Sequence, residues 1–111
     1  MNATKQQTDW VNFINYYSDA NKDRPTRIGL FEKIADVTHD YWIEDGLPLR
    51  GIDLDMKNGT PVIEIMLDGY SHVVRGVTSL RPTYSIDGAE EGLDFIGPGE
   101  TTTILRFENQ P

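Results

Sequence analysis

Three acidic residues that lie close together in the sequence are the first candidates for chemistry. Asp53 and Asp55 alternate with apolar residues, which is the pattern of a β-strand with one buried face. The dipeptide Asn58-Gly59 follows them and strongly favours a two-residue hairpin turn. Counting back from that turn places Glu64 opposite Asp53, so the three carboxylates share one face of the predicted hairpin. A carboxylate-based site is one interpretation of this face, and a merely solvated surface is the other.

The sequence does not support metal binding by these carboxylates. Asp53, Asp55 and Glu64 match three positions of a calcium-binding loop. Lys57, however, occupies a ligand position of that loop, and Asn58 replaces its required glycine. The chain has two histidines and no cysteine, so neither a His-rich nor a Cys-based zinc site is expected. We therefore expect no metal and no cofactor.

Three further residues carry charge or a titratable proton in the same part of the chain. Arg75, on the next predicted strand, lies diagonal to Glu64 and would neutralise part of the acidic face. His72 follows a serine, but neighbours on a strand point to opposite faces and cannot act as base and nucleophile. Arg50 lies beside Pro48, in a segment that must be an edge, a bulge or a crossing, and strand packing does not explain it. We expect no catalytic residue, and the candidate binding residues are Arg50, Asp53, Asp55, Glu64, His72 and Arg75.

An amphipathic helix is expected over residues 9–20, ahead of these strands. Its apolar side chains fall at i, i+3, i+4 and i+7 and form one stripe that would pack on the rest of the chain: Trp10, Phe13, Ile14 and Tyr17. Thr8 is placed to cap the free N–H groups of the first turn. Asn21 and then Pro25 are expected to end the helix.

The clearest strand signal is the hairpin over residues 51–67. Its two-residue turn pairs Leu54 with Ile63 and Ile52 with Ile65, so that apolar residues meet on one face. A second turn, at residues 68–69, is expected to return the segment 70–77 alongside it, with His72 on the apolar face. Weaker strands are expected over residues 27–33, 37–43, 82–86, 92–96 and 102–107.

Strands that follow one another without intervening helices imply an antiparallel meander of about six to seven strands. Between the last two strands, a three-residue loop pairs Phe95 with Thr103 and aligns the apolar residues better than a four-residue loop. We expect an α+β fold in which the N-terminal helix packs on this sheet, with strong curvature or a partly barrel-like shape left open. The 111 residues leave room for one domain, over 1–111, with 1–8 flexible.

The charge of the chain limits its partners. The formal net charge is -8, and residues 35–111 carry net -9, from five Lys and Arg against fourteen Asp and Glu. Such a surface repels nucleic-acid phosphate and anionic membranes, so neither is expected as a partner. A macromolecular partner should present a basic face. The polar N-terminus and the lack of a long apolar stretch favour a cytoplasmic protein.

Several of these motifs together resemble a family of small bacterial proteins that is known only as a domain of unknown function. The resemblance rests on Trp10-x-x-Phe13, on the segment Leu-Pro-Leu-x-Gly-Ile-x-x-Asp that ends at Asp55, and on the Thr-rich strand that ends at Phe107. It extends over nearly the whole chain and implies a compact bacterial domain. It implies no catalytic residue.

Three functional interpretations follow. The first is a non-catalytic module that binds a protein or small-molecule partner. The second is a small enzyme with a carboxylate-based site, which is less well supported because no convergent acid, base and nucleophile are visible. The third is a structural subunit of a homo-oligomer. An exposed apolar patch or an open strand edge would favour binding. A pocket that unites His72, Arg50 and the carboxylates would favour an enzyme.

Overall fold

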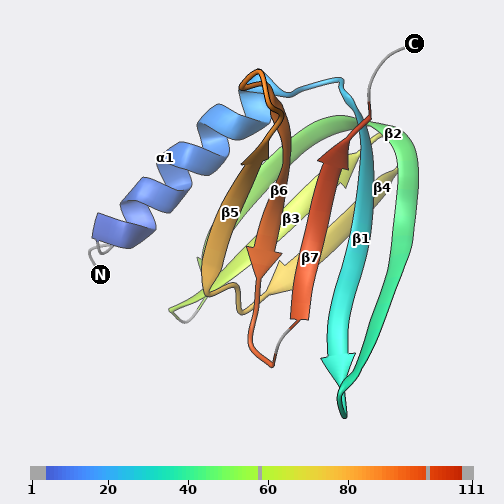
Figure 1. The fold of residues 1–111 in the computed structure, drawn as a ribbon. Coiled ribbons are helices and arrows are strands. Elements are labelled where there is room, and N and C mark those ends of the chain that lie inside the picture. The colour runs from blue at the N-terminus through green and yellow to red at the C-terminus, as the bar shows by residue number, and fades with distance from the viewer. Residues whose placement is uncertain (1–4, 58, 100, 109–111) are drawn as a thin grey trace.

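The computed structural model describes residues 5–57, 59–99 and 101–108, in which one helix precedes seven strands (Figure 1). The helix is α1 (Lys5–Ala20), and the strands are β1 (Pro25–Ile34), β2 (Val37–Lys57), β3 (Thr60–Leu67), β4 (Tyr70–Arg75), β5 (Ser79–Tyr84), β6 (Glu90–Ile96) and β7 (Thr101–Phe107). Neighbouring strands are all antiparallel. The predicted α+β fold, with an N-terminal helix on an antiparallel sheet, is therefore confirmed.

The seven strands form one sheet with the order β4-β3-β2-β1-β7-β6-β5. The chain runs through neighbouring strands from β1 to β4 and again from β5 to β7, and β7 then pairs with β1. The two edges of the sheet are β4 and β5. The sheet is not closed or strongly curled, so the strong curvature and partly barrel-like shape that the sequence left open are not found.

β2 joins the two halves of the sheet. Its first part pairs with β1 and its second part with β3, and the register shifts between Leu49 and Gly51. Pro48, which has no N–H to donate to a ladder, lies at this transition. The expected strand over 37–43 and the first strand of the expected hairpin are thus one strand of 21 residues. The bulge or crossing expected around Pro48 is confirmed.

The predicted strand registers are confirmed wherever the structure describes them. Across β2 and β3, Leu54 pairs with Ile63 and Asp53 with Glu64. Gly59 has φ +79°, as the hairpin turn requires, while Asn58 lies outside the described residues. The expected pairings of β3 with β4 and of β6 with β7, including Phe95 with Thr103, are also observed.

α1 contributes two fully buried side chains to the hydrophobic core, Ile14 and Tyr17, while Trp10 and Phe13 are half-buried. The helix begins at Lys5, so Thr8 lies inside it and the predicted cap is wrong. After the helix ends at Ala20, the Asn21 side-chain amide donates a hydrogen bond of 2.9 Å to the carbonyl of Tyr17. Among the described residues, no helix is long and apolar enough to cross a membrane.

Candidate functional site

The acidic face predicted from the sequence forms a shallow hollow of about 200 Å³. Val62 and Val73 contribute apolar atoms to its lining. Next to it, the Ser71 hydroxyl donates a hydrogen bond of 2.6 Å to Glu64 Oε2. The described residues contain no group of three or more His, Cys, Asp or Glu side chains arranged to hold a metal ion. Of the six candidate binding residues, the structure brings four together in this hollow: Asp53, Asp55, Glu64 and Arg75.

The other two candidates lie elsewhere. His72 shares a face of β4 with buried Val74, opposite to the acidic hollow, and burial lowers the pKa of its imidazole below the ordinary value of 6.5. Arg50 forms an ion pair with Asp23 and a second one, at 3.6 Å, with Asp68. These pairs connect the turn after α1 to the turn between β3 and β4. They give Arg50 the structural explanation that strand packing alone did not provide.

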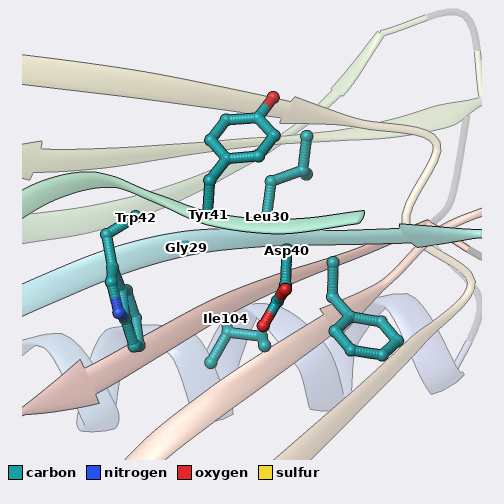
Figure 2. Close-up of a pocket in the computed structure, with 7 residues that line it drawn as sticks. Gly29, Leu30, Asp40, Tyr41, Trp42 and Ile104 are labelled. Carbon is teal, nitrogen blue, oxygen red and sulfur yellow. The ribbon is translucent and has the colours of Figure 1, made fainter. Parts of the chain in front are cut away.

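A second hollow, of about 130 Å³, lies on the other half of the sheet. Figure 2 shows Trp42, Asp40 and Ile104 on one side of the paired strands, while Tyr41 and Leu30 extend to the other side. Alternation along the strands puts the first three residues on the outer face, opposite to the face that carries the core. We call this site the Trp42 hollow, and its lining includes Gly29, Phe31, Asp40, Trp42 and Ile104.

Gly29 explains how the indole of Trp42 lies against the sheet. The two residues are paired across β1 and β2, and a Cβ on Gly29 would stand only 2.8 Å from Trp42 Cε3. On the same face, the Arg27 guanidinium lies 4.5 Å from the centroid of the Trp42 ring. Trp42 nevertheless remains 48% exposed, and Phe31 is 39% exposed. The hollow is thus lined by accessible aromatic side chains, and the backbone of Gly29 lies beneath the indole of Trp42.

Charges of both signs surround the Trp42 hollow. Arg27 Nε lies 3.7 Å from Glu108 Oε1. A side-chain hydrogen bond with Asp45 raises the pKa of Glu108, and the positive charge of Arg27 opposes this effect. Arg27 is therefore already engaged by an aromatic ring and a carboxylate. Asp40 is the carboxylate in the lining of the hollow.

The Trp42 hollow was not predicted from the sequence. One signal for it was present, because Tyr41 and Trp42 are adjacent on a predicted strand and must point to opposite faces. At least one large aromatic side chain therefore had to leave the core face. The pairing with Gly29 could not be recognised, since it depends on the register between β1 and β2.

The comparisons with known proteins give a fold and no activity. No family model matches the chain, and no curated protein matches it. The crystal structure of the Bacillus subtilis YojF protein is similar, with a TM-score of 0.52 and 16% sequence identity. The alignment covers 100% of this chain and 94% of that protein. YojF is itself uncharacterised, so the similarity supports the fold alone.

Proposed function

We propose that this chain is a non-catalytic binding module whose Trp42 hollow receives a cationic side chain of a basic protein partner. The observation that carries the proposal is the presence of an exposed indole and the Asp40 carboxylate in one hollow. The motif resemblance to an uncharacterised bacterial family implies a bacterial domain and assigns no role. On that basis we expect the module to act in a bacterial cytoplasm.

The chemistry of the hollow suits a lysine or arginine side chain. An ammonium or guanidinium group over an indole gains about 0.5–2 kcal/mol, depending on how far it is desolvated. Asp40 adds a charge-assisted hydrogen bond, and Ile104 and Phe31 offer apolar contact to the aliphatic stem of the side chain. Because Arg27 packs on the Trp42 ring and pairs with Glu108, we expect the incoming cation to contact Asp40 and the part of the indole that remains exposed.

The overall charge of the chain favours the same partner. With a formal net charge of -8, the protein attracts a basic segment over a distance and raises its association rate. The lining of the Trp42 hollow holds one carboxylate and no histidine, serine, cysteine or lysine. Binding is therefore better supported than acid–base or nucleophilic catalysis.

The test is a fluorescence titration with a blocked pentalysine peptide. The chain has two tryptophans, so the substitution Trp10→Phe makes the signal report on Trp42 alone. We expect a saturable change with a Kd of about 1 mM at low salt. Weaker binding is expected at higher salt, because the Debye length shrinks from about 10 Å at 0.1 M to about 3 Å at 1 M. The Nε-acetylated peptide, which lacks the charges, should not bind.

Matched variants locate the site. Asp40→Asn should weaken binding at least about five-fold, a loss of roughly 1 kcal/mol. Glu91→Gln removes one exposed acidic charge from β6 and serves as the control with little effect. Equal binding by the Asp40→Asn protein would contradict the proposal. If instead Asp53→Asn combined with Asp55→Asn abolishes binding, the partner uses the acidic hollow.

A further inference from the structure

β4 is an edge of the sheet, and its outer side has no strand partner in the described part of the chain. The amide N–H of Gly76 donates to the carbonyl of Pro61 on β3, at 3.2 Å. The inward and outward directions of backbone groups alternate along a regular strand, and β4 pairs with β3 without a register shift. Ser71, Val73 and Arg75 therefore direct their N–H and C=O groups away from the sheet.

The other edge strand, β5, has two features that block pairing and that β4 lacks. β5 contains Pro82, which lacks an N–H, and its register shifts between Thr83 and Tyr84. Prolines and bulges of this kind are the devices by which proteins prevent edge strands from pairing. The six residues of β4, Tyr70–Arg75, contain neither a proline nor a bulge. Val73 on this strand is also 43% exposed.

We propose that two copies of this chain associate through β4, as antiparallel strands related by a two-fold axis at Val73, which makes one continuous sheet. In this register Val73 faces its own symmetry mate, and Ser71 faces Arg75 of the other copy. All of these residues present outward N–H and C=O groups, so the two strands can form up to about six backbone hydrogen bonds. The two valine side chains cover one another on the outer face.

The charges favour this register. Arg75 of one copy lies opposite Ser71 of the other, whose hydroxyl is bonded to Glu64 at 2.6 Å. The guanidinium can therefore reach a carboxylate of the partner and form two equivalent ion pairs across the axis. The two Glu64 side chains are three strand spacings apart, or about 14 Å. At physiological salt that distance exceeds the Debye length of about 8 Å, so their repulsion is screened.

The contact is small, and the association should be weak. A single pair of edge strands falls below the roughly 1,200 Å² typical of stable complexes, so we expect a Kd of about 100 µM. Sedimentation equilibrium of the full chain from about 10 µM to 1 mM covers this range. The average mass should rise from 12.6 kDa toward twice that value. A mass that stays at 12.6 kDa up to about 1 mM would overturn the proposal.

Val73→Pro tests the strand pairing. The Val73 N–H points outward, so proline in both copies removes two bonds between the copies and none of the bonds between β3 and β4. We expect at least about a ten-fold weaker association, with an unchanged circular dichroism spectrum. Dimerisation as tight as that of the wild-type chain would exclude β4 as the interface.

A mixing experiment tests the register and does not depend on the proline variant. Arg75→Glu and Glu64→Arg should each weaken association, because each places like charges across the axis. An equimolar mixture of the two proteins should recover dimers, since every contact in the mixed dimer joins opposite charges. A contact within one chain could not be restored by mixing, so a mixture that stays monomeric would refute the arrangement. Arg81→Glu on β5 is the control reversal and should leave association unchanged.

Discussion

The structure predicts that Gly92→Ala, which adds a single methyl group, strongly destabilises the sheet. A Cβ at Gly92 would stand 2.1 Å from the carbonyl oxygen of Leu105 and 2.9 Å from Arg106 Cδ. An ordinary contact begins at 3.4 Å, so β7 would have to move away from β6 by about 1.3 Å, the difference between 3.4 and 2.1 Å. The Leu105 carbonyl belongs to the backbone, so it cannot move away by a rotamer change as a side chain could.

The cost follows from that displacement. A ladder hydrogen bond that lengthens by more than about 1 Å is lost. Two such bonds, at about 1 kcal/mol each, add to an overpacking strain of about 1–3 kcal/mol. The free energy of unfolding should therefore fall by about 3–5 kcal/mol, a large share of the roughly 5–15 kcal/mol of an ordinary domain. At about 4 °C per kcal/mol, the Tm should drop by roughly 12–20 °C.

The assay is urea unfolding followed by circular dichroism, with Gly51→Ala as the matched control. Gly51 is also a buried strand glycine, but the atom nearest to its added Cβ is Met66 Cε at 3.4 Å. Alanine fits there, and that variant should stay within about 1 kcal/mol of the wild-type chain. If Gly92→Ala is equally well tolerated, the close approach of β6 to β7 is not a real constraint and the reasoning fails.

Two further predictions concern the core and pH. Ile14→Ala empties a fully buried position and should cost about 2–5 kcal/mol in urea unfolding, whereas an unchanged midpoint would show that α1 is peripheral. Burial lowers the pKa of His72 below 6.5, so the unfolded chain binds a proton on this imidazole more readily than the folded chain does. The contribution of neutral His72 to the free energy of unfolding is therefore complete above pH 6.5 and is lost as the pH falls below that value. His72→Gln should reduce the loss of stability between pH 7.5 and 5.5, and the exposed His39→Gln should not; equal losses would contradict this assignment.

The local part of the fold could be predicted because adjacent residues determine it. The Asn58-Gly59 turn fixes the register of β2 and β3, and a one-residue slip would expose Ile63 and bury Glu64. The same reasoning covers the Asp68-Gly69 turn. In each case the turn chemistry and the apolar alternation lead to one alignment.

The non-local part of the fold could not be predicted in this way. No turn connects β1 to β7, so nothing near Ile28 in the sequence indicates its pairing with Leu105. The length of β2 was missed because the strand over 37–43 and the first strand of the hairpin were predicted separately, whereas the structure joins them through the change of partner at Pro48. The start of α1 was also missed, because the polar residues before Trp10 give no apolar period.

The candidate sites also divide into one formed by local contacts, which could be predicted, and one formed by non-local contacts, which could not. Asp53, Asp55 and Glu64 could be grouped because a single hairpin brings them together. The Trp42 hollow depends on Gly29, and the importance of this glycine is recognised only when its partner across the sheet is known. Because this hollow exists where glycine has no side chain, no sequence motif marks it.

The pairing of β1 with β7 also bears on how the chain reaches its native state. The partners Ile28 and Leu105 are 77 positions apart, whereas the turns of the β2–β3 and β3–β4 hairpins close within a few residues. Hairpins form in about 1–10 µs, but contacts between distant segments must first overcome the entropy of closing a long loop. This topology should give a high contact order and slow folding.

Until β7 docks, β1 keeps one unpaired edge and the core lacks Leu105 and Phe107. During synthesis this state lasts at least until the final strand has been made. A half-assembled sheet with an apolar face and a free central edge is prone to aggregate. The yield of refolded protein should therefore fall as the protein concentration rises, even under conditions in which the native state is stable.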